Sequence, residues 1–137
     1  MPPMYENINT SSLSFFKKTN LFLMHCVSVY PGTYEIANLP KMKKLMTLHK
    51  NVGYSDHIEG VESAKIAIGE GAKVIEKHFT IDNDLPGRDN KFAILPNELK
   101  DLTNFINNRE MMLESTGMGY NSMEEDSRNN YAGRFDK

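Results

Sequence analysis

The stretch Asn51–Asn90 decides the fold, because two short strand-like runs within it each carry a histidine near their end. The first run reads NVGYSDH and ends at His57, and the second reads VIEKHFT and contains His78. An amphipathic segment with helical spacing lies between the two runs. This order of strand, helix and strand predicts neighbouring parallel strands, whose backbones lie about 4.8 Å apart.

Alternation along these strands groups four polar side chains. Residues two apart in a strand share a face, so Ser55 is predicted beside His57 and Glu76 beside His78. Active sites of α/β folds collect at the carboxyl ends of parallel strands, which is where both histidines fall. Two imidazoles at matching heights, with a carboxylate and a hydroxyl beneath them, are a donor set that one divalent cation can share.

Simpler interpretations of the same residues stay open at this point. A histidine at a strand end is more often a surface or hydrogen-bonded group than a metal ligand, and the separation of His57 from His78 is not a metal motif by itself. Glu76 and Lys77 are compatible with a solvated pair, although Glu76 shares a face with His78. His25 is predicted to be structural, because it faces away from the positions that follow it at 28 and 30.

The rest of the chain repeats the same βα pattern. The run Leu21–Val29 is continuously apolar, which is typical of a strand buried on both faces of a parallel sheet. The other predicted elements are helices over 38–50, with Asn38 as cap and Pro40 in the first turn, 59–70 and 96–114, and strands over 52–55 and 73–80. This order implies right-handed crossovers. Three strands make a thin sheet, so we expect a piece of something larger, or half of an assembly.

The predicted βα units occupy residues 13–116, beginning with the end of a helix at 13–19. Residues 1–12 are polar without a clear period and are predicted to be a disordered leader. Residues 117–137 are polar and rich in Gly and Asn, which indicates a tail or linker.

Composition excludes several classes of partner. The chain has 137 residues and a formal net charge of −2, without a basic cluster, so no nucleic-acid partner is expected. No apolar run reaches the roughly 18 residues that a membrane span needs, and no signal peptide is evident. The single cysteine, Cys26, is predicted to be a buried small apolar residue, and it fits a reducing cytoplasm.

Four segments together resemble one enzyme family. They are HCVSVYP at 25–31, GYSDH at 53–57, GAKVIEKHFT at 71–80 and PGRD at 86–89. They are similar to the sialic acid synthases, the phosphoenolpyruvate-dependent N-acetylneuraminate synthases with their legionaminic and pseudaminic relatives. The resemblance covers about residues 13–130, and it implies a catalytic TIM barrel followed by a small antifreeze-like domain.

The chain resembles only the last three βα units of that (βα)8 barrel. We therefore expect an α/β fold that is a partial TIM barrel. The first five strands of the family, with the lysines that hold phosphoenolpyruvate, have no counterpart here, and neither does the antifreeze-like domain. A truncated or split reading frame is one explanation, and the chain is expected to be inactive alone.

The resemblance also implies roles for individual residues. His57 and His78 match the metal ligands, and the metal is Mn²⁺ or Mg²⁺. That metal would polarise the aldehyde of an open-chain N-acetylmannosamine, or of a related N-acetylhexosamine, for attack by phosphoenolpyruvate, with loss of phosphate. Glu76 matches a catalytic group that handles a proton or orients a ligand. The substrate-binding residues that the resemblance implies are Ser28, Tyr30, Ser55 and Asp89.

Two positions depart from the family pattern. Ser28 stands where many relatives have asparagine, so its contact with phosphoenolpyruvate is the least secure of the four. Arg88 replaces the proline that is common in the family's PGPD loop, a change that bears on the choice of sugar. The acceptor sugar, its phosphorylation and the choice of metal stay open.

Three functions fit these observations. The first is a nonulosonate synthase acting in carbohydrate biosynthesis. The second is a non-catalytic half-barrel or remnant, which needs a separately encoded N-terminal half or a second copy because unsealed sheet edges invite pairing. The third is a Schiff-base aldolase, which is disfavoured because Lys77 is predicted to face away from His78.

Overall fold

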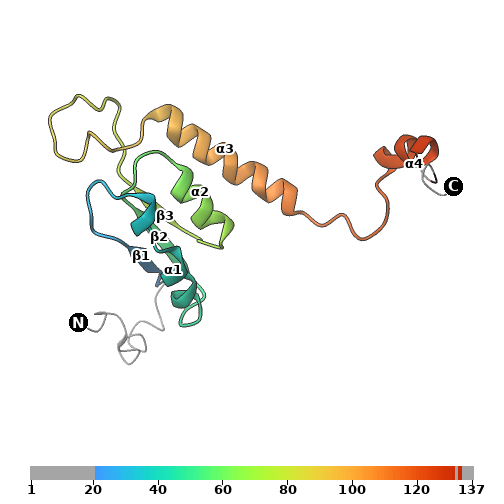
Figure 1. The fold of residues 1–137 in the computed structure, drawn as a ribbon, viewed down its shortest axis with the longest axis horizontal. Coiled ribbons are helices and arrows are strands. Elements are labelled where there is room, and N and C mark those ends of the chain that lie inside the picture. The colour runs from blue at the N-terminus through green and yellow to red at the C-terminus, as the bar shows by residue number, and fades with distance from the viewer. Residues whose placement is uncertain (1–20, 132, 134–137) are drawn as a thin grey trace. The chain divides into compact units, whose positions relative to one another are not determined.

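A three-stranded parallel sheet organises the fold. The computed structural model describes residues 21–131 and 133, and the sheet runs in the order β1-β2-β3 (Figure 1). The strands are β1 (Leu23–Cys26), β2 (Val52–Asp56) and β3 (Ile75–Lys77). The predicted leader at 1–12 and the predicted helix end at 13–19 lie outside the described residues.

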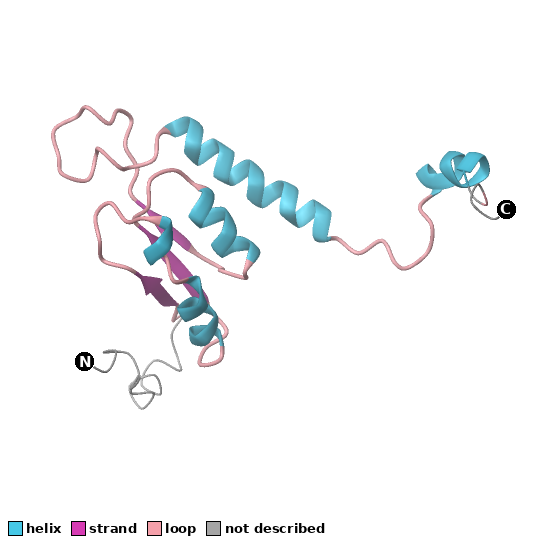
Figure 2. Ribbon diagram, in the orientation of Figure 1, coloured by secondary structure: helices cyan, strands magenta, loops and turns pink. Residues whose placement is uncertain are grey.

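Helices connect the strands in the predicted order (Figure 2). The helices of this part of the chain are η2 (Tyr34–Ile36), α1 (Leu39–Met46), α2 (Glu62–Gly69) and α3 (Pro96–Leu113). Asn38 precedes α1 but has a φ of 45°, and its side chain makes no capping hydrogen bond, so the predicted side-chain cap is wrong. Proline in the first turn of α1 is found as expected.

Both hydrophobic clusters lie on one side of the sheet. Alternate strand residues pack against helices there: Val52 and Tyr54 join Met42 of α1 and Ala67 of α2 in one cluster. The second cluster joins α2 and α3, and its buried members are Val61, Ala64, Ile68, Ile94 and Leu102. Ile75 of β3 packs against both clusters, so the helix-facing side of the sheet forms a continuous core.

The opposite face of the sheet is accessible at the outer strands β1 and β3, whereas its β2 residues are buried. Cys26 is exposed and Met24 is half-buried, so the predictions of a first strand buried on both faces and of a buried cysteine are wrong. Glu76 is exposed on the same face. Gly53 is required here, because a Cβ at this position would lie 2.6 Å from the carbonyl oxygen of Val74.

The described chain divides into two compact units, one ending at Ile106 and the other beginning at Asn107. The second unit contains η3 (Ser122–Glu124) and α4 (Glu125–Tyr131). Asn121 and Glu124 form a reciprocal capping box at the start of η3, so the segment predicted as a polar tail contains a short helix.

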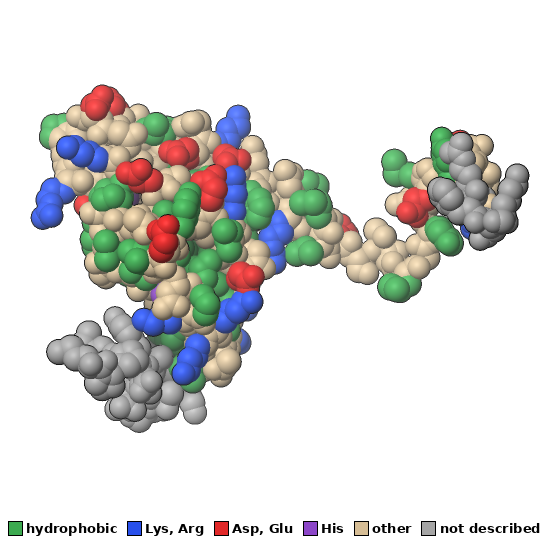
Figure 3. All heavy atoms as spheres, viewed as in Figure 1, with side chains coloured by type: hydrophobic (Ala, Val, Ile, Leu, Met, Phe, Trp, Pro, Cys, Tyr) green, Lys and Arg blue, Asp and Glu red, His purple; other side chains and the backbone are tan. Residues whose placement is uncertain are grey.

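The surface drawn in Figure 3 mixes both signs of charge among apolar side chains. Lys and Arg side chains are interspersed with Asp and Glu on this face. Among the described residues, none of the helices has the length and apolar content that crossing a membrane requires.

Candidate active site

His57 and His78 face each other beyond the ends of β2 and β3. Each histidine directly follows the last residue of its strand, and the centroids of the two rings are 5.3 Å apart. The strands pair in parallel with Ser55 opposite Glu76, so the two imidazoles lie at matching heights. The geometry that strand alternation predicts is therefore present.

Hydrogen bonds fix the orientation of His57. Its Nδ1 lies 3.1 Å from the carbonyl oxygen of Val27, which only accepts, so Nδ1 is assigned as the donor. The main-chain carbonyl of His57 accepts a 2.8 Å hydrogen bond from the Gly32 N–H. This arrangement leaves the Nε2 lone pair of His57 available to a ligand.

His78 is held from the other side of the site. Its Nδ1 lies 3.6 Å from Oδ2 of Asp89, a residue of the loop that follows β3. Its main-chain carbonyl accepts a 2.9 Å hydrogen bond from the N–H of Ile94. Asp89, predicted from the resemblance, thus lies beside a site histidine, at a distance longer than a hydrogen bond.

Ser55 and Glu76 are joined directly. The Ser55 hydroxyl donates a 2.6 Å hydrogen bond to Oε1 of Glu76. Ser55 is buried whereas Glu76 is exposed, so the hydrogen bond from the Ser55 hydroxyl restrains a carboxylate that is otherwise solvated. A cavity of about 170 Å³ is lined by His57, Glu76, Lys77 and His78.

Two aromatic rings border the histidines. The ring centroid of Tyr30 lies 4.3 Å from that of His57 and 6.1 Å from that of His78. The ring of Phe92, which the sequence did not single out, lies 5.3 Å from that of His78 and is buried. Nothing in the local pattern around Phe92 distinguishes it from a loop apolar residue.

Ser28 lies toward the β1 side of the site. Its Oγ is 3.6 Å from Sγ of Cys26, and that sulfur is 3.9 Å from Nδ1 of His57. The Cys26 sulfur thus lies between the Ser28 hydroxyl and the His57 ring. His25 points to the helix side, where its Nε2 donates to the carbonyl of Ala37 at 2.7 Å, in keeping with its predicted structural role.

Lys77 belongs to a buried ion pair on the helix-facing side of the sheet. Its Nζ lies 2.9 Å from Oδ2 of Asp56, and the two side chains are 5% and 0% exposed. The interpretation of Glu76 and Lys77 as a solvated pair is therefore wrong. Lys77 faces away from the imidazoles, as alternation predicts, whereas its partner Asp56 was not anticipated.

The donor set is compatible with two protein ligands to a divalent cation. In residues 21–131 and 133, no group of three or more His, Cys, Asp and Glu side chains is arranged to hold a metal ion. His57 and His78 nevertheless present two facing imidazoles, and the Nδ1 of His57 is bonded to a carbonyl oxygen, as is usual behind a metal-bound histidine. Two ligands leave coordination positions for water or substrate oxygens.

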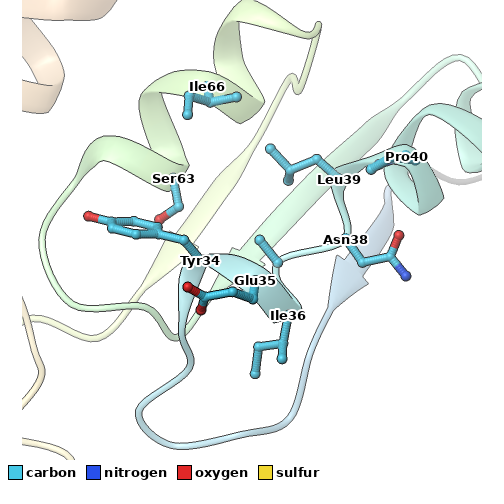
Figure 4. A pocket seen from close by; sticks show the side chains of 9 residues that line it. Tyr34, Glu35, Ile36, Asn38, Leu39, Pro40, Ser63 and Ile66 are labelled. Atoms are coloured by element: carbon cyan, nitrogen blue, oxygen red, sulfur yellow. The ribbon is translucent and has the colours of Figure 1, made fainter.

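A larger hollow lies elsewhere, between η2, α1 and α2 (Figure 4). Its volume is about 720 Å³, and its lining includes Tyr34, Leu39, Ser63 and Ile66. Its one carboxylate is Glu35, whose pKa is lowered by a hydrogen bond from the Thr33 side chain. Size favours this hollow, but the smaller cavity between the histidines has the convergent chemical groups.

Comparison with known proteins defines the class to which this fold and site belong. A sialic acid synthetase from Leptospira borgpetersenii serovar Hardjo-bovis, solved in complex with citrate, superposes with a TM-score of 0.71 at 33% identity. The superposition covers 88% of this chain and 45% of the Leptospira chain. The α/β arrangement of three parallel strands and helices is thus similar to part of a sialic acid synthetase.

Two curated relatives agree with this class. An N,N'-diacetyllegionaminic acid synthase from Legionella pneumophila is 45% identical over 69% of this chain and 27% of the relative. An N-acetylneuraminate-9-phosphate synthase from Drosophila melanogaster is 41% identical over 66% of this chain and 25% of the relative. The chain spans less than a third of the length of these relatives.

The family model described as the NeuB family matches residues 6–118. The chain belongs to the NeuB family.

Proposed function

We propose that this chain supplies the metal-binding part of a nonulosonate synthase. The reaction condenses phosphoenolpyruvate with N-acetylmannosamine or a related N-acetylhexosamine, giving a sialic acid and phosphate. The observation that carries the proposal is the pair of facing imidazoles, 5.3 Å apart, beside the Ser55–Glu76 hydrogen bond. Relatives named as sialic and legionaminic acid synthases support the assignment.

His57 and His78 would hold the cation, Mn²⁺ or Mg²⁺. The chemistry that this cation supplies when bound is Lewis-acid polarisation of the acceptor's aldehyde. Glu76, which lines the cavity, is proposed to take or give a proton at a carboxylate oxygen, and the hydrogen bond from Ser55 to Oε1 would hold that carboxylate in position.

Substrate contacts follow from the same arrangement. Tyr30, whose ring lies 4.3 Å from that of His57, and Ser55, which is bonded to Glu76, are proposed to contact phosphoenolpyruvate, as is Ser28 beside Cys26. Asp89, on the loop beside His78, is proposed to bind the sugar hydroxyls. A single cysteine and these metabolite substrates suit the cytoplasm.

The three βα units are proposed to be the last part of a (βα)8 barrel. The open face bearing Ser55 and Glu76 would then be the barrel interior, because inward-facing residues alternate with outward ones along barrel strands. The second candidate function is a non-catalytic half-barrel. Its support is that β1 and β3 each pair on one side only in the described residues, which leaves edges with which another chain can pair.

A phosphate-release assay tests the proposal. The purified chain, given phosphoenolpyruvate, N-acetylmannosamine and Mn²⁺, is expected to release no phosphate above background. Mixing it with the part of the Legionella synthase that lies outside the match is expected to restore release, and His57→Ala should abolish the restored activity.

The matched control is His49→Ala, which removes a histidine that bonds Asn51 at the opposite end of β2. This variant should keep the restored activity. Strong turnover by the chain alone that disappears in His57→Ala would show that no complement is needed. A mixture that stays inactive while the two parts associate would favour the non-catalytic alternative.

A further inference from the structure

The two residues that precede the site histidines are themselves partners. Asp56 lies opposite Lys77 in the register of β2 and β3, directly before His57 and His78 in the chain. Their side chains form an ion pair at 2.9 Å on the helix-facing side of the sheet and are almost wholly buried. Successive strand residues point to opposite faces, so this pair lies beneath the imidazoles.

Further hydrogen bonds join the ion pair to the backbone of Ile58, the residue that follows His57 in the chain. Oδ1 of Asp56 accepts from the N–H of Ile58 at 3.1 Å, and the Nζ of Lys77 donates to the Ile58 carbonyl. Oδ2 of Asp56 also accepts from the hydroxyl of Ser63 at 2.7 Å. Both chain neighbours of His57 are thus anchored to the residue that precedes His78.

A buried ion pair contributes little net stability compared with a well-packed apolar pair, because burying both charges is costly. In some proteins buried polar or ionic groups instead fix the geometry between the segments that bear them. Here those segments are the two strand ends that present the imidazoles. Shifting either strand end by one residue would break the pair and turn a histidine to the wrong face.

We propose that Asp56 and Lys77 are positioning residues, a cross-strand ion pair that holds His57 and His78 at the spacing that a divalent cation requires. This inference rests on the proposed function, because it takes the cation as the ligand of the two imidazoles. It assigns the ion pair no contact with substrate. If the ion pair only stabilised the core, replacing Asp56 and Lys77 with uncharged residues would leave the distance between the two imidazoles unchanged.

Mn²⁺ binding to the full 137-residue chain tests this role. The affinity is measured from the loss of the free-Mn²⁺ signal in electron paramagnetic resonance, with circular dichroism to verify folding. Lys77→Met and the double variant Asp56→Asn/Lys77→Met are compared with wild type. Both are expected to bind Mn²⁺ about tenfold to a hundredfold more weakly, the usual effect of removing groups that orient metal ligands.

The double variant guards against simple unfolding. It leaves no uncompensated buried charge. Its amide oxygen can still accept from the Ile58 N–H, and its NH2 group can donate to the Ser63 hydroxyl oxygen. The matched control is Lys65→Met, which breaks the 2.6 Å ion pair with Asp101 between α2 and α3. It should bind Mn²⁺ within about twofold of wild type, because distant sites act independently.

A second measurement needs no metal. In the metal-free chain, a nuclear Overhauser contact between the ring protons of His57 and His78 is expected for wild type and Lys65→Met, and is expected to be lost in the double variant. A folded double variant that keeps this contact, or that binds Mn²⁺ like wild type, overturns the positioning role. If wild type itself does not bind Mn²⁺, the proposed function fails. The nuclear Overhauser contact then remains as the test of whether the ion pair positions the two imidazoles.

Discussion

Tyr54 is a buried residue whose ionisation makes the stability of the fold depend on pH. It is 1% exposed, and its ring stacks on that of His25 at 5.5 Å across the register of β1 and β2. Burial raises the pKa of the Tyr54 phenol, because the charged phenolate loses its hydration. The nearby Asp56 carboxylate raises this pKa further by repelling the phenolate.

The chain should therefore lose stability in alkali. The folded-state pKa of Tyr54 lies above the value of about 10 for an unfolded chain, so the contribution is complete below pH 10 and is lost as pH rises above it. The free energy of unfolding should fall by up to about 1.4 kcal/mol per pH unit from this group. Urea unfolding followed by circular dichroism at about pH 9 and about pH 11 measures the loss. Tyr54→Phe should show a smaller loss, and an equal loss would contradict the assignment.

Period-two alternation was sufficient to group the site residues of β2 and β3. Placing Ser55 with His57 and Glu76 with His78 needs only the direction of successive side chains in each strand. Pairing Asp56 with Lys77 needs the register between the strands, which the sequence does not show. Without that register, Lys77 was open to interpretation as a solvated partner of Glu76.

At the scale of the element, α2 and α3 are held together by the cluster around Leu102. Leu102 is 5% exposed and packs with residues of α2 and with Ile94. Lys65 and Asp101 form an ion pair beside this contact, and the hydrogen bond that Lys65 donates to the Asp101 carboxylate raises the pKa of Lys65. Exposed pairs of this kind contribute little, so the apolar cluster carries the contact.

Leu102→Ala should destabilise the chain by about 2–5 kcal/mol, because it removes buried methyl groups and leaves a cavity between the two helices. The matched control is Leu99→Ala on the same helix, where the side chain is 40% exposed. Its cost should stay below about 1 kcal/mol. Urea denaturation at neutral pH compares the two variants, and equal losses would show that α3 does not dock through Leu102.

The sequence predicted the three strands and the helices α1, α2 and α3, with the starts of β2 and α3, but it misplaced other ends. The second helix was expected from residue 59 and begins at Glu62, because Gly60 adopts a φ of 75° in the preceding turn. The first strand was expected over 21–29, yet only Leu23–Cys26 pairs with β2. Strand ends depend on the neighbouring strand, which composition alone does not reveal.

At the scale of the whole molecule, the strands differ in how completely they are paired. In the described residues, β2 pairs with a strand on each side, whereas β1 and β3 each pair on one side. An unpaired strand side presents N–H and C=O groups that another strand can pair with. The proposed barrel would place further strands at both of these edges.

Amide hydrogen exchange of the chain alone should follow this order, with β2 exchanging most slowly and β1 and β3 faster, because local opening is easier where fewer backbone groups are bonded. Adding the part of the Legionella synthase that lies outside the match should slow exchange in β1 and β3. Exchange in α2 should change little, because this helix packs on the other face of the sheet. The measurement is exchange followed by mass spectrometry of peptides from each element. If exchange in β1 stays unchanged in a mixture that releases phosphate, the added part does not pair at that edge, and the barrel arrangement proposed for these three strands fails.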